Sequence, residues 1–285
     1  MSSKNNPIAH LAKALHRKFA QLLLQKARPP KTIKNEKPYL EEREGILALH
    51  FDRLSVQSEM DIERPDELIL TYTRAMMSFL LLNPQPRHIT MIGLGGGSLA
   101  KYCYRYLPTT DITVVEINPE VIALRSEFAI PPDDARFKIL VGDGAEYISN
   151  KNNKLEVLMV DGFDAGGMPS QLGSQKFYDR CFASLADDGI LVVNLWGSNL
   201  LYSEYLTRIQ QSFANRVVVL EADDSLNKIV FAVKQANFPP SHQTIQQHAE
   251  ILSASHSLNF HAKSHKMIVN LPSQAVSNSV LNDPQ

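Results

Sequence analysis

Between residues 86 and 234, short apolar runs alternate with longer segments of helical periodicity, and this alternation constrains the fold more than any other feature of the sequence. Within the runs, apolar residues follow one another instead of alternating with polar ones. Such runs are typical of strands that are buried on both faces, as in parallel sheets. Strands that alternate with helices therefore predict an α/β fold, in which helices cover both faces of a mostly parallel sheet.

The expected elements follow a simple order along the chain. Five strands are predicted, at 88–93, 111–117, 136–142, 154–162 and 189–196. Helices are expected after them, at 98–107, 119–128, 145–150, 175–186 and 202–213. Two further strands, 216–222 and 228–234, lie close together in the sequence, which predicts an antiparallel hairpin at one edge of the sheet. A sheet that ends in this way is typical of class I methyltransferase-like (Rossmann-like) folds.

The segments that flank this core differ from it in composition. Residues 1–37 carry nine Lys or Arg against one acid, with apolar residues at helical spacing, which predicts a basic amphipathic arm. Residues 38–84 are expected to form a small β-unit of two strands and a linking helix over 66–82. Residues 85–235 are the predicted α/β domain. Residues 236–285 hold five of the nine histidines at spacings that match no compact metal site, and we interpret them as a polar, solvated C-terminal tail.

Charge, cysteine content and hydropathy exclude several classes of protein. With a net charge of -1 over 285 residues, no bulk electrostatic field points to a nucleic-acid or membrane partner. Two cysteines, Cys103 and Cys181, cannot build a disulfide framework, which favours a reducing compartment. No apolar run approaches the roughly 18 residues of a membrane span, and the first residues lack the apolar core of a secretory signal. We therefore expect a cytoplasmic protein without a membrane span.

A glycine-rich turn, MIGLGGGSLAKY, joins the first expected strand of the core to the helix after it. Gly93, Gly95, Gly96 and Gly97 can adopt positive φ and let a ligand approach the backbone without meeting a Cβ atom. The N–H groups at the start of the helix can then face polar parts of that ligand. Because tight turns between strands and helices also occur for packing reasons, the glycines alone leave a structural and a ligand-binding interpretation open.

Acidic residues follow the next three strands of the core at their carboxyl ends. Glu116 ends the second strand, 19 residues after Gly97, near the spacing of about 20 expected for an acid that binds a ribose diol. Asp143, which Gly144 follows, comes after the third strand, and Asp161 comes after the fourth. Each acid by itself could be a helix cap. Together with the glycines they predict a ligand site at the edge of the sheet where open α/β folds bind their ligands.

An adenosyl sulfonium, either S-adenosylmethionine or its decarboxylated form, is the ligand that best explains the glycine turn together with the three acids at the strand ends. The carboxylate of Glu116 can accept hydrogen bonds from both ribose hydroxyls, while one further acid meets the adenine amine and another the cationic end of the donor. A nicotinamide dehydrogenase shares the glycine turn and Glu116 but does not predict the acids after the third and fourth strands. A Walker-type phosphate loop is excluded because no Gly-Lys-Ser/Thr follows the glycines.

The order of these motifs resembles the spermidine synthase (polyamine aminopropyltransferase) family. The resemblance covers roughly residues 45–233 and rests on the glycine-rich turn, VVEINPEVI, VGDG, VDGFD and QKFYDRCFASLADDGILVVN. It implies a transferase that moves an aminopropyl group from decarboxylated S-adenosylmethionine to a small amine, a polyamine such as putrescine. The donor is a co-substrate, so no permanently bound cofactor and no metal are expected. Dimers are common among similar proteins, which suggests a homodimer.

The same resemblance carries roles over to individual residues. Asp161 would be the catalytic acid that deprotonates the attacking amine. Asp164 and Tyr72 would bind the amine substrate. The donor would be bound by residues of the glycine turn, the strand ends and the small β-unit, namely Gly93, Gly95, Gly97, Glu116, Asp143, Gly144 and Gln57.

The sequence departs from the family pattern where the acceptor would bind. The family's glycine turn contains an Asp, which Gly96 or Ser98 replaces here, and Arg74 stands where the family has an acid after Tyr72. Two alternatives therefore stay open. One is a methyltransferase that uses intact S-adenosylmethionine on a non-polyamine acceptor, with Lys101 or Arg74 near the donor carboxylate. The other is a non-catalytic protein that binds a nucleoside, or a partner through its basic arm.

Overall fold

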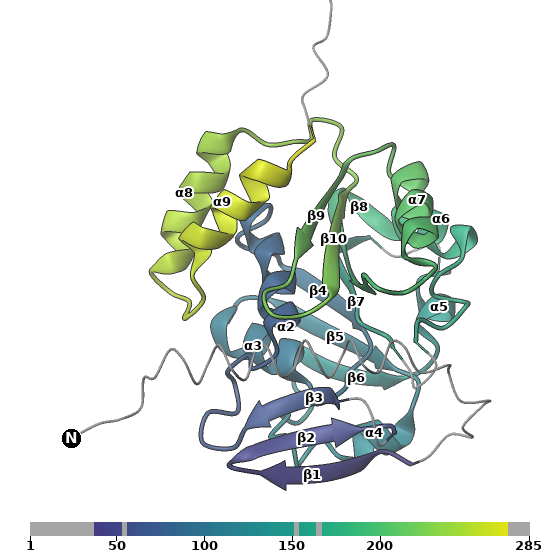
Figure 1. The fold of residues 1–285 in the computed structure, drawn as a ribbon, viewed down its shortest axis with the longest axis vertical. Coiled ribbons are helices and arrows are strands. Elements are labelled where there is room, and N and C mark those ends of the chain that lie inside the picture. The colour runs from purple at the N-terminus through teal and green to yellow at the C-terminus, as the bar shows by residue number, and fades with distance from the viewer. Residues whose placement is uncertain (1–36, 53–55, 151–153, 164–166, 273–285) are drawn as a thin grey trace, which may run out of the picture.

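The computed structural model describes residues 37–52, 56–150, 154–163 and 167–272, and these residues form two β-sheets (Figure 1). The larger sheet has seven strands in the order β6-β5-β4-β7-β8-β10-β9. Its strands are β4 (His88–Ile92), β5 (Asp111–Glu116), β6 (Phe137–Val141), β7 (Leu155–Val160), β8 (Leu185–Trp196), β9 (Val217–Glu221) and β10 (Asn227–Val233). Neighbours from β6 to β8 run parallel, and β10 runs antiparallel to β8 and β9. The predicted mostly parallel α/β fold with its edge hairpin is confirmed.

The strand order places the start of the core in the middle of the large sheet. The chain forms β4 first, continues outward through β5 and β6, and returns to the other side of β4 with β7. In open α/β sheets, ligands bind outside the carboxyl ends of the strands beside such a reversal. The glycine turn, Glu116, Asp143 and Asp161 stand at the ends of β4, β5, β6 and β7. The fold therefore brings these predicted residues to one edge of the sheet.

Alternate residues of the buried strands pack into two hydrophobic cores, one on each face of the large sheet. In β8, Ile190 and Val192 belong to the first core, and Leu191 and Val193 belong to the second. The first face is covered by α2 (Thr71–Met76), the 3₁₀ helix η1 (Met77–Leu81), α3 (Ser98–Tyr106), α4 (Pro119–Ala123), α8 (His242–Ser253) and α9 (Phe260–Asn270). The second face is covered by α5 (Gly144–Tyr147), α6 (Gln175–Ser184) and α7 (Tyr202–Ser212).

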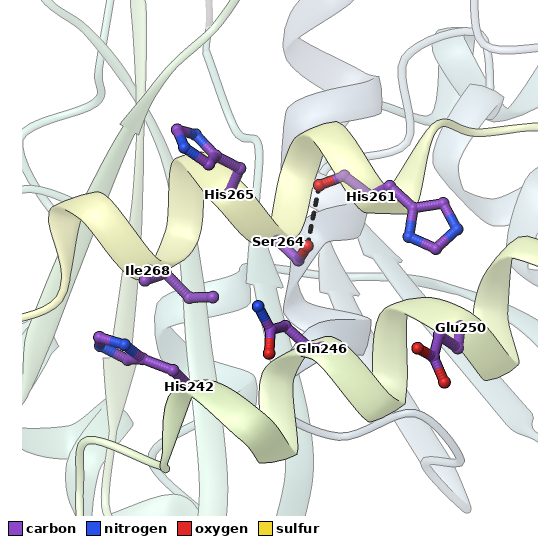
Figure 2. Close-up of a pocket in the computed structure, with 7 residues that line it drawn as sticks. All are labelled: His242, Gln246, Glu250, His261, Ser264, His265 and Ile268. Atoms are coloured by element: carbon purple, nitrogen blue, oxygen red, sulfur yellow. Dashed lines mark hydrogen bonds between the residues drawn. The ribbon is translucent and has the colours of Figure 1, made fainter.

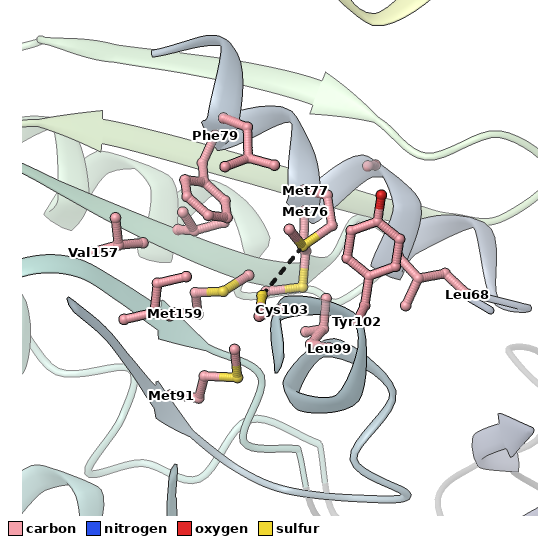
Figure 3. Close-up of a cluster of buried hydrophobic side chains, with 14 of the residues drawn as sticks. Leu68, Met76, Met77, Phe79, Met91, Leu99, Tyr102, Cys103, Val157 and Met159 are labelled. Carbon is pink, nitrogen blue, oxygen red and sulfur yellow. Dashed lines mark hydrogen bonds between the residues drawn. The ribbon is translucent and has the colours of Figure 1, made fainter. Parts of the chain in front are cut away.

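The first core is rich in sulfur where the helices meet the sheet. Met76 and Met77 lie in the same buried cluster as Met91 of β4 and Met159 of β7 (Figure 3). The Sγ of Cys103 lies 3.9 Å from the Sδ of Met77. Unbranched methionine side chains fill irregular space between helices and strands. Burial raises the pKa of the Cys103 thiol, so this cysteine packs as an apolar residue and is not a reactive thiol.

The small N-terminal sheet has three antiparallel strands, one more than its sequence predicts. They are β1 (Tyr39–Arg43), β2 (Ile46–His50) and β3 (Val56–Asp61). The sequence YLEER of β1 lacks a clear apolar alternation, but the turn at Glu44 and Gly45, both with positive φ, pairs it with β2. The Ser58 hydroxyl oxygen of β3 lies 3.4 Å from that of Ser98, the first residue of α3. The small sheet therefore borders the glycine turn.

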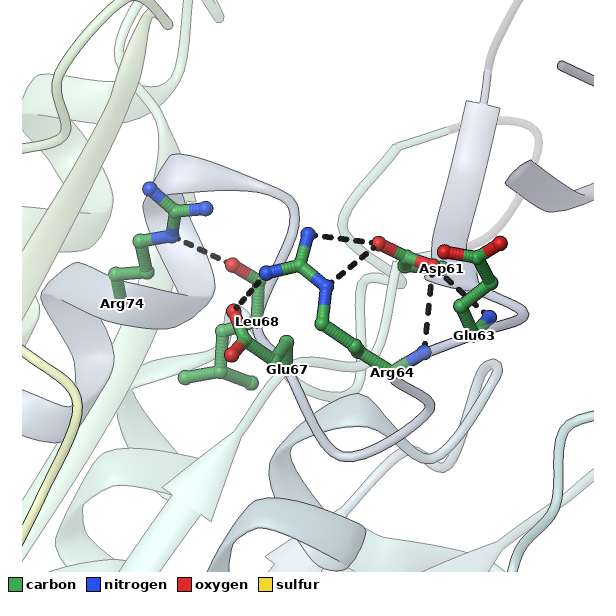
Figure 4. A network of polar contacts seen from close by, with 6 residues as sticks. All are labelled: Asp61, Glu63, Arg64, Glu67, Leu68 and Arg74. Atoms are coloured by element: carbon green, nitrogen blue, oxygen red, sulfur yellow. Dashed lines mark hydrogen bonds and ion pairs between the residues drawn. The ribbon is translucent and has the colours of Figure 1, made fainter. Parts of the chain in front are cut away.

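The linking helix begins later than its pattern predicts. Helix was expected from residue 66, but α2 begins at Thr71. The carboxylate of Asp61 accepts hydrogen bonds from the backbone N–H groups of Glu63 and Arg64, at 3.0 and 3.3 Å, and from the Arg64 guanidinium (Figure 4). Aspartate contacts with nearby backbone N–H groups compete with helix formation. They hold the preceding segment in a turn and delay the start of the helix.

The C-terminal region contains two packed helices, so the prediction of a solvated polar tail is wrong for residues 242–270. Helices α8 and α9 are N-capped by the side chains of Ser241 and Asn259. They contact η1, and α9 also contacts β9. Their buried apolar residues are Ile245, Ala249, Leu252, Phe260 and Met267. These residues are widely spaced among polar ones, so the polar composition of the segment concealed an amphipathic helix pair.

Three of the five histidines of this region line a pocket of about 540 Å³ between α8 and α9 (Figure 2). Its lining residues are His242, Gln246, Glu250, His261, Ser264, His265 and Ile268. In the described ranges, no group of three or more His, Cys, Asp and Glu side chains could hold a metal ion. Among the helices that the structure describes, none combines the length and the apolar character of a membrane span.

His256 links the C-terminal helices to α3, and its surroundings predict a pH-dependent stability. Its Nδ1 lies 2.8 Å from the hydroxyl of Tyr102, and its ring packs against Tyr106 and Phe260. Burial lowers the pKa of His256 because the imidazolium form is disfavoured there. The unfolded chain then binds this proton more readily than the folded one. This contribution to stability is therefore lost as the pH falls through the unfolded-state pKa of about 6.5.

We expect His256→Gln to weaken the pH dependence of the unfolding free energy between about pH 8 and about pH 5. Glutamine keeps a hydrogen-bonding group near Tyr102 but takes up no proton in this range. Urea denaturation at a series of pH values measures the effect. The exposed His242→Gln is the matched control and should retain the wild-type pH dependence. If the unfolding free energy of His256→Gln depends on pH as strongly as that of the wild type, protonation of His256 does not destabilise the protein in acid.

Candidate active site

The glycine turn after β4 depends on glycine for both conformation and space. Gly93, Gly95 and Gly97 have φ values of 96°, 52° and 68°, in the left-handed region that favours glycine. A Cβ atom on Gly93 would lie 2.3 Å from the backbone oxygen of Asp161, and one on Gly97 would lie 2.5 Å from Ile130. The turn thus holds the end of β4 directly against the end of β7.

Gly93→Ala is expected to destabilise the protein by about 3 kcal/mol, because alanine adds backbone strain and a clash with the Asp161 backbone. Gly45→Ala separates the two effects, since Gly45 has a φ of 77° and no atom lies within 4 Å of an added Cβ. Strain alone should cost this control about 1 kcal/mol. Chemical denaturation measures both changes. Equal losses in the two variants would contradict a tight contact between the turn and β7.

Gly96 stands at one of the two positions where the family pattern expects an acid, and the space beside it is already filled. A Cβ atom here would lie 2.6 Å from the Ser58 hydroxyl oxygen and 2.8 Å from the Phe128 ring. An aspartate therefore does not fit unless Ser58 or Phe128 moves. Ser58 and Phe128 thus occupy the space that the family's aspartate side chain would need at position 96.

Glu116 is buried, at 7% exposure, and both of its carboxylate oxygens accept backbone hydrogen bonds. Oε2 accepts from the N–H of Leu94 in the glycine turn at 2.7 Å, and Oε1 accepts from the N–H of Asn118 at 2.8 Å. Burial raises the pKa of Glu116, and the backbone N–H groups oppose this rise. Since each carboxylate oxygen can accept a second hydrogen bond, the group is oriented and still able to bind hydroxyls.

Asp143 is the N-cap of α5, which is the helix-cap role that the sequence analysis left open for each of the acids. One of its carboxylate oxygens accepts from the N–H of Ala145 at 2.7 Å. A Cβ atom on Gly144 would lie 2.4 Å from Ile92, so glycine lets α5 approach the end of β4. The cap occupies one oxygen of Asp143 and is compatible with a ligand at the other. The adenine contact stays a prediction.

Asp161, at the end of β7, receives hydrogen bonds from two side chains that are distant in the sequence. The Tyr72 hydroxyl of α2 donates to Oδ2 at 3.1 Å, and the Asn194 amide of β8 donates to Oδ1 at 2.9 Å. Burial raises the pKa of Asp161, and both donors oppose the rise. Burial and the nearby carboxylate also raise the pKa of Tyr72, so its hydroxyl stays protonated and can donate. The predicted amine-site residues Asp161 and Tyr72 are therefore in direct contact.

Asn194 and Asn227 are site residues that the sequence analysis missed. Asn194 is 2% exposed, and its Oδ1 accepts from the Nδ2 of Asn227 at 2.8 Å. A signal for Asn194 exists in the sequence, because it is the lone amide in the apolar run ILVVNLW. A polar side chain in a buried strand requires a hydrogen-bond partner, and here one partner is Asp161.

Arg74 and Lys101, the cations considered for the donor carboxylate, both bind backbone carbonyl groups. Arg74 is exposed, and its Nε donates to the oxygen of Leu68 at 2.5 Å (Figure 4). Because Arg74 stands only two residues after Tyr72 on α2, the two side chains leave the helix on different sides. Lys101 is 1% exposed and donates to the oxygen of Phe128 at 2.7 Å, and burial lowers its pKa to about 8. The positive charge of Arg74 is thus directed away from Tyr72, the residue that contacts Asp161.

The roles predicted for Gln57 and Asp164, like those of the other site residues, stay predictions. Gln57 lies on β3 at a register shift, because Leu49 pairs with Ser58 while His50 pairs with Val56. Bulges of this kind redirect side chains, and the contact of Gln57 with a donor stays a prediction. Asp164 lies outside the described residues.

Comparison with known proteins identifies the family. The spermine/spermidine synthase domain matches residues 69–225, which is more than half of the chain. The chain belongs to the spermine/spermidine synthase family. A polyamine aminopropyltransferase of Neisseria meningitidis serogroup A is 38% identical over 224 residues, covering 78% of this chain and 85% of that protein. The matched domain contains Tyr72, Glu116, Asp143 and Asp161, and it also contains Asn194.

Solved structures of spermidine synthases and of a methyltransferase have folds similar to that of this chain. A probable spermidine synthase from Corynebacterium glutamicum has a TM-score of 0.64 at 18% identity, covering 90% of this chain and 100% of that one. Human methyltransferase-like protein 13 has a TM-score of 0.58 at 21% identity, covering 74% of this chain and 97% of that one. At these identities the likeness concerns the fold alone, and it confirms the class I methyltransferase-like architecture.

Proposed function

We propose that this member of the spermine/spermidine synthase family transfers an aminopropyl group from decarboxylated S-adenosylmethionine to a polyamine such as putrescine. The observation that carries the proposal is the Asp161 carboxylate, which accepts hydrogen bonds from Tyr72 and Asn194 and pairs with no Lys or Arg of the described residues. A carboxylate in this state attracts a cation from outside the protein. The 38% identical relative is a polyamine aminopropyltransferase, which supports an amine as that cation.

The donor would lie across the carboxyl ends of β4, β5 and β6. In this arrangement Glu116 accepts hydrogen bonds from the ribose hydroxyls, and Asp143 meets the adenine. The glycine turn lets the nucleoside approach the backbone, with Gln57 contributing from β3. The sulfonium carries its own leaving group, so the reaction needs no nucleophile from the protein. The protein contributes chiefly by holding donor and acceptor in line.

Asp161 would remove the proton that keeps the acceptor inactive. An alkyl amine has a pKa near that of lysine, about 10.4, so at neutral pH it is an ammonium without a free electron pair. The raised pKa of Asp161 makes it a stronger base than an ordinary aspartate. Once Asp161 takes the proton, the amine nitrogen attacks the propyl carbon on sulfur. The C–N bond forms as the C–S bond breaks, and methylthioadenosine leaves with the electron pair.

The surroundings of the donor favour the decarboxylated form over intact S-adenosylmethionine. The intact donor carries a carboxylate that requires a cation or several N–H groups. Arg74 and Lys101, the cations considered for this role, donate to backbone carbonyl oxygens. This observation weighs against a methyltransferase reaction, and the acids at the strand ends suit a donor with a free ammonium.

The proposal is tested by incubating the protein with decarboxylated S-adenosylmethionine and a panel of amines. The panel contains putrescine, longer diamines and polyamines, and butylamine as a monoamine of matched length. We expect putrescine to yield spermidine, identified by mass, and butylamine to react far more slowly, because it lacks the second ammonium that Asp164 would bind. If the donor binds and no amine is consumed, the proposed transfer is wrong.

A further inference from the structure

Three polar side chains continue one face of the large sheet beyond its hydrophobic core. Met159 of β7 and Val192 of β8 belong to the core on the face that α2 covers. Asp161 and Asn194 stand two residues further along these parallel strands, and alternation directs their side chains to the same face. Asn227 joins them from the first residue of antiparallel β10. The three therefore form a row across neighbouring strands at the edge that carries the candidate active site.

Hydrogen bonds connect the row in one direction. The Nδ2 of Asn227 donates to the Oδ1 of Asn194 at 2.8 Å, and the Nδ2 of Asn194 donates to the Oδ1 of Asp161 at 2.9 Å. We propose that Asn194 and Asn227 are positioning residues that orient the Asp161 carboxylate and hold it ready to accept the substrate proton. This inference rests on the proposed role of Asp161 as the base.

The second asparagine matters because an amide has a donor end and an acceptor end. By itself, Asn194 could present either end to Asp161. Since Asn227 offers an N–H group to the Asn194 oxygen, the NH₂ end of Asn194 must face the acid. An N–H donor stabilises the carboxylate, whereas a carbonyl oxygen would stabilise the protonated acid. Asn227 thus controls the protonation of Asp161 without touching it.

The two donors to Asp161 also fix the plane of its carboxyl group. Tyr72 donates to Oδ2, and Asn194 donates to Oδ1, so each oxygen has one fixed contact. A carboxylate offers about four acceptor positions, which leaves acceptor capacity for an incoming ammonium. The row therefore orients the base while keeping part of it available to the substrate.

Two variants test the inference. Asn194→Leu keeps the size of the side chain and removes the donor to Asp161. Asn227→Asp keeps the shape but replaces the N–H group by an acceptor, which should turn the Asn194 amide over and present its oxygen to Asp161. Thr90→Val is the matched control, because Thr90 is a buried polar residue of β4 whose hydroxyl has no partner among the described residues.

The first readout is the titration of the Asp161 carboxyl group in the ligand-free protein. It is followed by NMR of protein with ¹³C-labelled aspartate, in which Asp161→Asn assigns the signal. This measurement does not depend on turnover, so it remains decisive if the proposed transferase activity is not found. The second readout is the acid limb of the pH profile of kcat/KM with decarboxylated S-adenosylmethionine and putrescine.

We expect Asn194→Leu to raise the titration midpoint of Asp161 by about one to two pH units, the loss of one hydrogen bond to a charged group. The acid limb of kcat/KM should move by the same amount. Asn227→Asp should move both in the same direction, and Thr90→Val should move neither. Unmoved midpoints in both Asn variants would overturn the inference. A shift of the midpoint in Asn194→Leu alone would overturn the role of Asn227. Because Asn227 is only partly buried, the Asn227→Asp variant remains informative if Asn194→Leu fails to fold.

Discussion

Asp161→Asn is expected to lower kcat/KM for putrescine by about 10²–10⁴-fold, the range for loss of a general base. Asparagine retains the shape of the side chain but accepts no proton from the substrate ammonium. It also carries no charge to attract that ammonium to the end of β7. Affinity for methylthioadenosine should change little, because the proposed nucleoside contacts are made by Glu116 and the glycine turn. Steady-state rates at saturating donor, with binding measured separately by calorimetry, distinguish the two effects.

The control for this variant is Asp188→Asn, an equal change at an exposed aspartate of β8. It should leave both the rate and the binding unaltered. The result that speaks against the account is an Asp161→Asn enzyme with near wild-type kcat/KM. Another group would then have to accept the proton, and the contact between Tyr72 and Asp161 would be purely structural.

Glu116→Gln is expected to weaken the binding of methylthioadenosine by about 10–100-fold, as for loss of a hydrogen bond to a charged group. The amide keeps one acceptor oxygen, so at most one ribose hydroxyl retains a good partner. Its NH₂ group would also face the N–H of Leu94 or of Asn118, which disturbs the orientation of the turn. Isothermal titration calorimetry at pH near 7 measures the change in dissociation constant.

An analogue of the nucleoside that lacks both ribose hydroxyls provides the decisive comparison. It should lose much less affinity in Glu116→Gln than the full nucleoside does, since it makes no contact with the carboxylate and is affected only through the turn. Glu127→Gln, at an exposed position after α4, controls for the loss of a negative charge. If the full nucleoside and the hydroxyl-free analogue lose affinity equally in Glu116→Gln, the residue shapes the turn and does not bind the ribose.

The positions at the strand ends were predictable because each lies beside a strong local signal. Glu116, Asp143 and Asp161 follow apolar runs, and the parallel order brings the ends of those runs to one edge of the sheet. The contacts between them were not predictable. Tyr72 lies 89 residues from Asp161 and Asn194 lies 33 residues from it. Only the packing of α2 against the sheet and the pairing of β8 with β7 show that they meet.

The errors have local physical causes. The start of the linking helix was misplaced because Asp61 binds backbone N–H groups that a helix would otherwise use. The C-terminal helices were missed because residues such as Ile245 and Phe260 are sparse in a polar segment, and their burial depends on tertiary contacts of the two helices with η1. The direction of the Arg74 side chain was not predictable either, because the side from which it leaves α2 depends on where that helix begins.

The central claim is that the strand-end site binds a decarboxylated adenosyl sulfonium and transfers its aminopropyl group to an amine. The most direct test is a competition in one sample that contains equal concentrations of decarboxylated and intact S-adenosylmethionine together with putrescine. Mass spectrometry then identifies the nucleoside released. We predict methylthioadenosine, formed together with an equal amount of spermidine, and no S-adenosylhomocysteine. Release of S-adenosylhomocysteine, or no nucleoside product at all, would contradict the account.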